Sequence, residues 1–330
     1  MGFESADSAI GRELAIGIDL GGTQIRAALV TRAGAILHRA ATATAAQAGA
    51  EAVVAQIADL AHAMAARAGG PVLGLGLCAP GPLDAARGIA LSTPTIAGFT
   101  DFPLKRAVEA RSGLPVVLEN DGIAAAVGEW RFGAGRGTRH MVYATVSTGI
   151  GGGVVADGRV LRGRMGMAGH IGHMTIRQDG APCACGHRGC FEAEASGTAF
   201  LARARRAARD EPTSSLHAHA AGLIASDVFD AADGGDALAW RLVAEEAELL
   251  GLGFAGLLHL YSPERLVMGG GMAHQFARLA PLIEATMRRA ALPPFRDVPL
   301  VAAELGDNSG LVGAASLLFD AHLAPPAAMV

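Results

Sequence analysis

Two similar glycine-rich hairpin patterns constrain the fold of this 330-residue chain more than any other feature. In the first, the strand-like run Ala-Ile-Gly-Ile-Asp-Leu of residues 15–20 leads into Gly-Gly-Thr, and strand-like residues then continue to Thr31. A dinucleotide-binding fold would instead open a helix after its glycine-rich turn. The pattern therefore predicts a β-hairpin whose turn can offer backbone N–H groups to phosphate, with the carboxylate of Asp19 beside it.

The second pattern, over residues 142–155, repeats this design. A strand-like run ends in Ser-Thr, a glycine-rich turn follows, and strand-like residues then resume. Either turn alone is also compatible with an ordinary hairpin that binds nothing. The pair favours an internal duplication with a cleft between two halves, in which each turn holds one end of a polyphosphate. The chain is long enough for two domains that each bury a core.

Composition and charge argue against several classes of protein. Apolar residues make up 51% of the chain and charged residues 18%, as in globular and not in disordered proteins. The formal net charge is −4 without any basic run, which argues against a nucleic-acid-binding surface. No apolar run has membrane-spanning length, and the first residues lack a signal-peptide pattern. We therefore expect a cytoplasmic protein, with loose ends over residues 1–13 and from His322 onward.

Hydrophobic periodicity predicts the remaining elements. Helices are expected over residues 45–68, 102–112, 123–131, 197–209, 237–260 and 311–319, and further strands over 72–78, 116–118, 265–268 and 298–303. Residues 79–84, 92–100 and 211–235 are expected to form turns, loops and short helix. Three glycines follow the strand at 265–268 directly, which would let a helix start approach a flat or charged ligand closely.

Asp121 is a candidate for acid–base chemistry because of its position in the chain. It follows the predicted strand 116–118 and precedes the predicted helix 123–131. An aspartate at the start of a helix is a common N-cap. The carboxyl edge of a parallel sheet is also where α/β proteins gather their catalytic groups. The two interpretations are compatible, and both stay open at this point.

Cysteine and histidine residues cluster between residues 163 and 192. Cys183, Cys185 and Cys190 lie within eight residues of one another, and His173 precedes them. Thiolates with one imidazole are the ligands that a tetrahedral zinc ion prefers. Buried thiols or a disulfide are the alternatives, but a disulfide would leave an odd thiol and suits secreted chains. Cys78 stands alone in an apolar run and is expected to be a packed core thiol.

Taken together, the motifs resemble those of the ROK family of sugar kinases and repressors over about residues 14–320. The matching motifs, in order, are Asp19-Leu-Gly-Gly-Thr23, Pro80-Gly-Pro82, Glu119-Asn-Asp121, Ser147-Thr-Gly-Ile-Gly151 with the segment 163–192, and Gly269-Gly-Gly271. The resemblance implies an α/β protein with the actin-like (ribonuclease H-like) two-domain ATPase fold, an interdomain cleft and a small zinc knuckle. Residues 14–121 plus 311–325 would form the small domain, and residues 122–310 the large one.

The resemblance also implies a role for each matching residue. Asp121 would be the base that takes the proton of the attacking sugar hydroxyl, Asn120 would hold a sugar hydroxyl, and Asp19 would help to place Mg²⁺ through water. The phosphates of ATP would be bound by Gly21, Gly22, Thr23, Thr148 and Gly149, and the adenosine by Gly269 and Gly270. A structural zinc ion would be held by His173, Cys183, Cys185 and Cys190, which leave it no open position. Glu192, His173, His170, Thr95 and Gly81 would face the sugar.

Departures from the family pattern bear on the sugar. Glucose-specific members usually read Ala-Gly-Glu-x-Gly-His where this chain places His170 at the Glu position. A carboxylate accepts two hydroxyl hydrogen bonds, whereas a neutral imidazole donates one and accepts one. The Ala-Gly-His-x-Gly-His form is similar to bacterial N-acetylmannosamine kinases, although Thr95 stands where Asn is more usual. The expected reaction is ATP-dependent phosphorylation of N-acetylmannosamine at its 6-hydroxyl, with glucose or another hexose or hexosamine as the alternative. Gln24 stands where Lys is common and removes a charge near the phosphates.

The resemblance leaves a non-enzyme alternative, because the family contains repressors and a member can sense sugar without catalysis. Repressors carry a DNA-binding segment before the first hairpin, and only 18 residues precede Asp19 here. We therefore expect an enzyme that binds ATP and a sugar, with neither a nucleic acid nor a membrane as a partner. A homodimer is expected because family members are commonly dimers.

Overall fold

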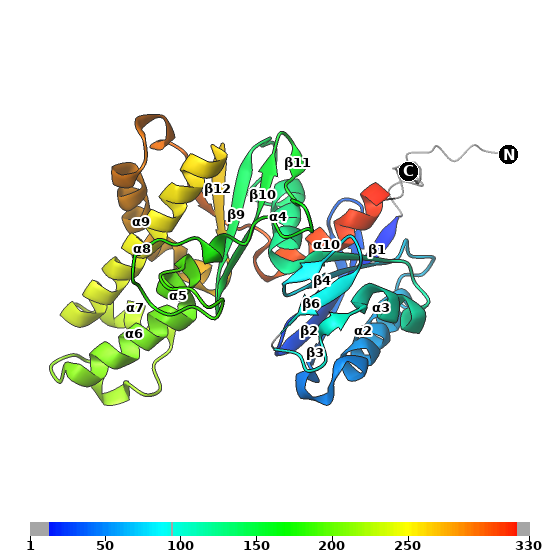
Figure 1. The fold of residues 1–330 in the computed structure, drawn as a ribbon, viewed down its shortest axis with the longest axis horizontal. Helices are drawn as coiled ribbons and strands as arrows, with labels where there is room; N and C mark the ends of the chain where they lie inside the picture. The colour runs from blue at the N-terminus through cyan, green and yellow to red at the C-terminus, as the bar shows by residue number, and fades with distance from the viewer. Residues whose placement is uncertain (1–12, 94, 322–330) are drawn as a thin grey trace. The chain divides into compact units, whose positions relative to one another are not determined.

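The computed structural model describes residues 13–93 and 95–321, which form two compact units (Figure 1). Within the described residues, unit 1 contains the chain up to Gly137, residues 160–169, and the chain from Asp307 onward. Unit 2 contains residues 138–159 and 170–306. This division assigns the helix after Asp121 to unit 1, whereas the predicted domain boundary would assign it to the second domain. The predicted loose ends lie outside the described residues, except for Glu13, which pairs with Arg32.

Unit 1 is built on a five-stranded sheet that contains the first predicted hairpin. Its strands are β1 (Leu14–Leu20), β2 (Gln24–Thr31), β3 (Ile36–Ala43), β4 (Leu75–Ala79) and β8 (Val116–Asn120), in the order β3-β2-β1-β4-β8. The β1–β2 and β2–β3 pairs are antiparallel, whereas β4 is parallel to both β1 and β8. The hairpin at the first glycine turn is therefore confirmed, and β3 extends it to a three-stranded meander.

Helices cover both faces of this sheet. One face packs on α2 (Ala50–Ala65), which contacts α3 (Leu104–Ser112), and the other on α10 (Ser309–Ala321), which contacts α4 (Asp121–Phe132). The α10 backbone lies close to the sheet because the facing strand residues are glycines. A Cβ at Gly17 would lie 2.1 Å from the Leu311 carbonyl oxygen, and one at Gly76 would lie 2.0 Å from that of Ala314.

A small antiparallel sheet was not predicted from the sequence. It consists of β5 (Leu83–Asp84), β6 (Ile89–Ser92) and β7 (Thr100–Phe102), in the order β5-β6-β7. The two outer strands are only two and three residues long, which is too short for an alternating pattern to be recognised.

Unit 2 repeats the sheet of unit 1. Its strands are β9 (Met141–Val146), β10 (Ile150–Ala156), β11 (Arg159–Val160), β12 (Arg265–Gly269) and β13 (Leu300–Ala302), in the order β11-β10-β9-β12-β13. The β9–β10 pair is antiparallel, and β12 is parallel to both β9 and β13. The corresponding strands of unit 1 have the same order, and the pairs that match these three run in the same directions. This correspondence supports the internal duplication that the two glycine-rich patterns predict.

Helices make up most of the rest of unit 2. They are α5 (Phe191–Ala195), α6 (Gly197–Asp210), α7 (Ala225–Asp233), α8 (Ala237–Tyr261) and α9 (Phe276–Ala290). Short 3-10 helices of unit 2 are η2 (Ile171–His173), η3 (His217–His219), η4 (Gly271–Gln275) and η5 (Pro293–Phe295). The 3-10 helix η1 (Ala46–Ala48) lies in unit 1, and η6 (Gly306–Asn308) spans the point in the chain where unit 2 ends and unit 1 resumes. The predicted helix start at the triple glycine is a 3-10 turn, η4, and α9 begins only at Phe276.

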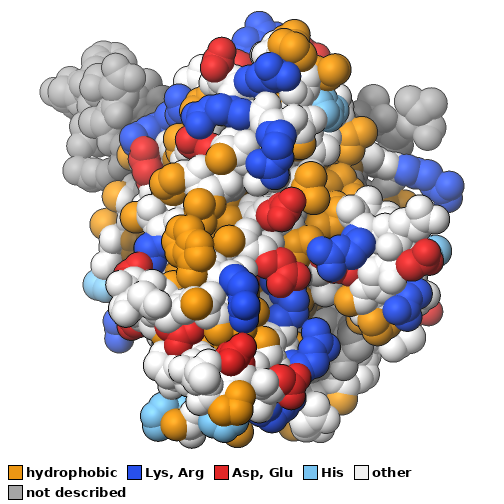
Figure 2. Space-filling model, turned by 90° about the vertical axis from the view of Figure 1, so that its left-hand side faces the viewer, with side chains coloured by type: hydrophobic (Ala, Val, Ile, Leu, Met, Phe, Trp, Pro, Cys, Tyr) orange, Lys and Arg blue, Asp and Glu red, His pale blue; other side chains and the backbone are white. Residues whose placement is uncertain are grey.

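On the face shown in Figure 2, Lys and Arg side chains are interspersed with Asp and Glu side chains and with apolar ones. Helix α8 contributes exposed apolar side chains to the surface, among them Trp240, Leu252 and Leu260. Among the residues that the structure describes, no helix combines the length and the apolar character needed to cross a membrane.

Candidate functional site

The candidate catalytic residues of unit 1 share one edge of its sheet. In the strand register, Asp19 on β1 is the Cα partner of Cys78 on β4, and Cys78 is the partner of Glu119 on β8. Because these three strands are parallel, their carboxyl ends lie at the same edge. Asp121 follows β8 directly as the first residue of α4. The structure thus brings Asp19 and Asp121 to one edge of the sheet.

Asp19 has partners that the sequence analysis did not identify. Its Oδ2 forms an ion pair with Arg26, which also donates a 3.1 Å hydrogen bond to the Asp307 carbonyl. The thiol of Cys78 lies 3.5 Å from Asp19 Oδ1. Burial raises the pKa of Cys78, and the neighbouring Asp19 carboxylate raises it further. Cys78 is thus a packed core thiol, as predicted, and it is protonated and can donate to Asp19.

Asn120, and not Asp121, is the N-cap of α4. Its side-chain oxygen accepts hydrogen bonds from the N–H groups of Gly122 and Ile123, at 3.0 and 3.3 Å. The N-cap interpretation of Asp121 is therefore wrong, because Asp121 is one residue inside the helix. The Asp121 side chain is exposed, and its Oδ1 accepts from its neighbour Gly122 at 2.7 Å. The positive end of the helix dipole stabilises negative charge at this position.

Glu119 is a buried carboxylate that the sequence analysis did not single out. It is 2% exposed, and its two oxygens accept from the Asn120 N–H at 3.1 Å and from Arg162 Nε at 2.9 Å. Arg162 belongs to residues 160–169, which lie in unit 1 although both flanking segments lie in unit 2. The ion pair therefore ties this short segment to the strand that ends at Asn120 and directly precedes Asp121.

The first glycine turn leaves two backbone donors available. The Gly21 N–H closes the turn on the Gln24 carbonyl at 2.9 Å. Across the described part of the chain, the N–H groups of Gly22 and Thr23 donate to no protein acceptor. Such consecutive amides are suited to bind phosphate. The Gly21 amide was predicted to bind the phosphates together with those of Gly22 and Thr23, but it donates its hydrogen bond within the turn instead.

Two predicted sugar-site residues lie near this edge of unit 1. Thr95 is exposed and packs over the turn, because a Cβ at Gly22 would lie 3.1 Å from the Thr95 Cβ. Gly81 follows the end of β4 and precedes Pro82 through a cis peptide bond. The sequence-predicted sugar residues Gly81, Thr95 and Asn120 therefore all belong to unit 1, and each neighbours the turn or the strand ends.

The second glycine turn, between β9 and β10, has the same character. Among the described residues, the N–H groups of Thr148 and Gly149 find no protein acceptor. Gly269 ends the neighbouring strand β12 and is the register partner of Thr145 on β9. Gly270 has a φ of 84°, and a Cβ there would lie 2.5 Å from the Val146 carbonyl oxygen. The predicted phosphate and adenosine residues of unit 2 therefore lie on adjacent strand ends.

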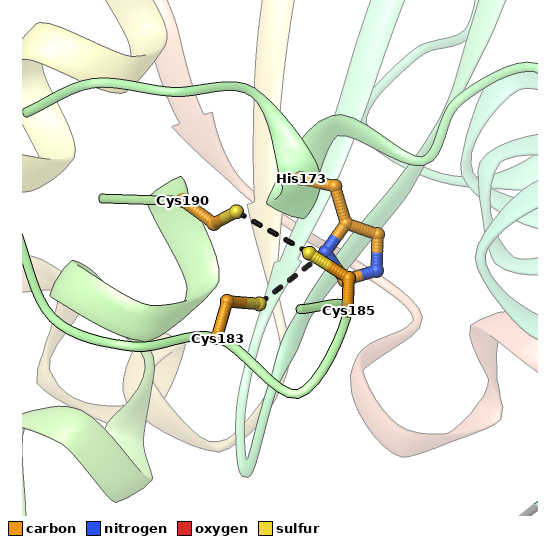
Figure 3. A group of neighbouring side chains, drawn as sticks. All are labelled: His173, Cys183, Cys185 and Cys190. Carbon is orange, nitrogen blue, oxygen red and sulfur yellow. Dashed lines mark hydrogen bonds between the residues drawn. The ribbon is translucent and has the colours of Figure 1, made fainter. Parts of the chain in front are cut away.

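The four predicted metal ligands converge in unit 2 (Figure 3). Their ligand atoms all lie within 4.8 Å of one another, with 3.6 Å between the sulfurs of Cys185 and Cys190. The distance from Cys183 Sγ to His173 Nδ1 is 3.7 Å. Ligands of a tetrahedral zinc ion, at about 2.3 Å for sulfur and about 2.0 Å for nitrogen, are roughly 3.5 to 3.8 Å apart. The donor set and its spacing therefore fit zinc.

The protonation of the thiols also bears on metal binding. Burial raises the pKa of Cys190 to about 12, with further contributions from Cys185 and Cys183. The backbone N–H of His187 lowers the pKa of Cys185. Zinc binds the thiolate form, so that binding at neutral pH displaces the Cys190 proton.

The residues predicted to read the sugar from unit 2 flank this cluster. His173 turns Nδ1 to Cys183, which leaves Nε2 directed away from the cluster and available for a hydroxyl. The ring centroid of His170 lies 6.5 Å from that of His173. The Glu192 carboxylate lies at the second glycine turn, where its Oε2 accepts from the Ile150 N–H at 2.9 Å. This contact was not anticipated for a residue assigned to the sugar.

Most of the chain matches the model of one protein family. The family model described as the ROK family matches residues 15–321. The chain belongs to the ROK family. Its glycine turns, sheet-edge aspartates and Cys3His cluster are therefore features of a ROK protein, and the predicted family membership is confirmed.

The proteins similar to this ROK chain include kinases that are named for different sugars. A glucokinase of Halalkalibacterium halodurans is 38% identical over 310 residues, covering 90% of this chain and 92% of that protein. An N-acetylmannosamine kinase of Yersinia pseudotuberculosis is 34% identical over 300 residues, covering 91% and 96%. The crystal structure of a ROK glucokinase from Streptomyces griseus, in complex with glucose and AMPPNP, has a TM-score of 0.81 and 37% identity, covering 92% and 98%.

Proposed function

We propose that this ROK protein is an ATP-dependent kinase that phosphorylates the 6-hydroxyl of a hexose or an N-acylhexosamine. The observation that carries the proposal is the edge of the unit 1 sheet, where Asp19 near the end of β1 and Asp121 directly after β8 lie at the carboxyl ends of parallel strands. The glycine turn that follows β1 has two free N–H groups. The kinases among the similar proteins support it, and one of them was crystallised with a sugar and an ATP analogue.

This arrangement suits the chemistry of phosphoryl transfer. The transition state is loose, so catalysis depends on positioning and on neutralisation of charge. Asp121 accepts the proton of the sugar hydroxyl as that oxygen attacks the γ-phosphorus. The N–H groups of Gly22 and Thr23 in one unit, and of Thr148 and Gly149 in the other, bind phosphate oxygens. Gly269 and Gly270 let the adenosine approach the backbone closely.

Asp19 would hold Mg²⁺ through water in this proposal. Its carboxylate already contacts Arg26 at one oxygen and the Cys78 thiol at the other. Mg²⁺ retains several of its waters in phosphate-binding sites, so an outer position for Asp19 is compatible with its coordination chemistry. The metal would neutralise charge on the transferred phosphoryl group.

His170 supports N-acetylmannosamine as the sugar. An imidazole in place of a carboxylate donates one hydrogen bond and accepts one, which changes the hydroxyl or acyl groups that it can bind. Glucose is the second candidate, because the glucokinase of H. halodurans is more similar to this chain than the N-acetylmannosamine kinase, at 38% against 34% identity.

Several finer features belong to the same proposal. The matching sheets of the two units support an actin-like ATPase fold. The Cys3His cluster supports a structural zinc knuckle. We also propose a homodimer. A sugar-sensing regulator without catalysis is the remote alternative, and the exposed Asp121 carboxylate at the sheet edge argues for catalysis instead.

A coupled assay of ADP release tests the proposal. The protein with ATP and Mg²⁺ is offered N-acetylmannosamine, glucose, N-acetylglucosamine and mannose in separate reactions. Sugar-dependent ADP release, highest with N-acetylmannosamine, is expected. A preference for glucose would overturn the sugar assignment alone, whereas no ADP release with any sugar would overturn the kinase.

A further inference from the structure

Helix α5 begins directly after the metal-ligand candidate Cys190 and is anchored in the core of unit 2. Its first residue, Phe191, is fully buried and packs edge-on against Phe254 of α8, with ring centroids 5.8 Å apart. A Cβ at Gly253 would lie 2.4 Å from the Phe191 ring. This close packing fixes the position of the helix, so that its carboxylates extend from a rigid base.

Glu192 extends from α5 to the β9–β10 turn. Its Oε2 accepts the 2.9 Å hydrogen bond from the Ile150 N–H, the first amide after Thr148 and Gly149. A Cβ at Gly149 would lie 2.4 Å from this oxygen, so a side chain there would displace the carboxylate. Glu192 therefore holds the turn whose two preceding N–H groups are free for phosphate.

Glu194 extends from the same helix to the loop that carries the cysteines. Its side chain is 4% exposed. One oxygen accepts from the Ala181 N–H at 2.5 Å, and the other lies 3.2 Å from Arg177 Nη1. Because Ala181 precedes Cys183 by two residues, this carboxylate positions the start of the cysteine loop.

A second route joins the histidine ligand candidate to the same turn. His173 is the last residue of η2, and Gly172 precedes it. A Cβ at Gly172 would lie 2.1 Å from the Ile150 carbonyl oxygen and 3.2 Å from the Glu192 Cβ. The short helix therefore packs directly on Ile150 and Glu192.

From these contacts we infer that occupancy of the Cys3His cluster is coupled through α5 to phosphate binding at the β9–β10 turn, with Glu192 as the positioning residue. The metal fixes Cys190 and His173, these fix α5 and η2, and Glu192 then fixes the amides of Thr148 and Gly149. The identity of the phosphate as that of ATP rests on the proposed function. Coupling of this kind is reciprocal, so nucleotide must also tighten metal binding by the same factor.

The test measures Mg²⁺–AMPPNP binding by calorimetry without sugar, so that any contact of Glu192 with the sugar does not contribute. Wild type, Glu192→Ala and Glu192→Gln are each studied zinc-loaded and after removal of zinc with a chelator. Glu192→Ala is expected to raise the nucleotide Kd about tenfold, because it removes a hydrogen bond to a charged acceptor. Glu192→Gln should stay within about twofold of wild type, since its amide oxygen accepts the same N–H. Glu248→Ala, on the exposed surface of α8, is the matched control and should leave the Kd unchanged.

Removal of zinc should raise the nucleotide Kd of wild type by a factor similar to that of Glu192→Ala. In the Glu192→Ala protein, removal of zinc should raise the Kd little further, because both changes break the same link between the Cys3His cluster and the β9–β10 turn. If zinc removal and Glu192→Ala raise the Kd by factors that multiply when combined, or if the Ala and Gln variants raise it equally, the inference is overturned while the kinase proposal remains intact. Absence of AMPPNP binding to zinc-loaded wild type would overturn both. If Glu192→Ala does not fold, the wild-type protein decides: AMPPNP must lower the fraction of zinc taken by a competing chelator, and an unchanged fraction would overturn the coupling.

Discussion

The carboxylate of Glu192 and the backbone N–H of Ile150 form a 2.9 Å hydrogen bond that joins α5 to the second glycine turn. The first glycine turn is held differently, because Thr44 Oγ1 donates to the Gly21 carbonyl at 2.7 Å. The two turns thus offer the same kind of backbone donors, with one stabilised by a neighbouring strand end and the other by a helix beside the metal cluster. Substitutions at the two turns should therefore have different consequences.

Replacement of His170 should change the sugar preference. His170→Glu introduces the carboxylate that the sequence analysis expects of glucose-specific members, so the ratio of kcat/KM for glucose to that for N-acetylmannosamine should rise about tenfold or more. Steady-state kinetics with both sugars measures this ratio. His219→Glu, at an exposed histidine elsewhere in unit 2, should leave it unchanged. An unaltered ratio in His170→Glu would remove His170 from the sugar site.

Loss of Arg162 should destabilise unit 1. The buried Glu119 carboxylate would lose the partner of one oxygen, but Arg162 is 46% exposed, so solvent screens part of the effect. Arg162→Ala should lower the free energy of unfolding by about 1 kcal/mol, measured by urea denaturation. Arg164→Ala, an exposed arginine of the same segment, is the control. Equal losses for both arginines would show that the ion pair contributes nothing specific.

Metal content should depend on the Cys3His cluster and not on Cys78. The purified protein should carry one zinc ion per chain by native mass spectrometry, because four ligand atoms within 4.8 Å form one closed site. Cys183→Ser should lose the ion. Cys78→Ser changes the one cysteine of the chain that is outside the cluster, in unit 1, and should retain the ion. Zinc loss in both variants would indicate that the ion depends on the overall fold and not on this ligand set.

The buried Glu246 should make stability depend on pH. Burial raises its pKa to about 8, against the opposing effect of Arg203 on α6. Because the folded pKa is raised, the stabilisation is fully present below the unfolded value of about 4.5 and is lost as pH rises through about 8. The stability difference between wild type and Glu246→Gln should therefore fall between pH 5 and pH 9 in urea unfolding. Glu245→Gln, at the half-exposed neighbour, is the control, and its stability difference from wild type should not change with pH. A stability difference for Glu246→Gln that stays constant with pH would mean that Arg203 keeps the Glu246 carboxylate ionised.

Local patterns in the sequence predict the two hairpins, most helices and the approach of the metal ligands. These features depend on alternation, on glycine turns and on ligand spacing within a short stretch of chain. Strand β3 alternates between half-buried and exposed positions, and after Ile36 and Leu37 these are filled by small and polar residues, so its pattern carries little hydrophobic signal. The strands of the small sheet were too short to recognise.

The contacts that support the site depend on pairing between distant segments, and sequence patterns show these poorly. Arg162 and Glu119 are 43 residues apart, and Glu194 contacts a loop on the far side of three cysteines. Arg26 is an instructive intermediate case. It is the direct cross-strand partner of Asp19, so a hairpin with its register specified would have revealed the ion pair.

The role of Asp121 as the catalytic base is the central claim, and one comparison tests it most directly. Sugar-dependent ADP release is measured for wild type and Asp121→Asn at saturating ATP and Mg²⁺, with sugar binding measured separately by calorimetry. Asn keeps the size and hydrogen-bonding shape of Asp but cannot take the proton, so turnover should fall about 10²- to 10⁴-fold while the sugar Kd stays within a few fold. Turnover equal to that of wild type would contradict the account.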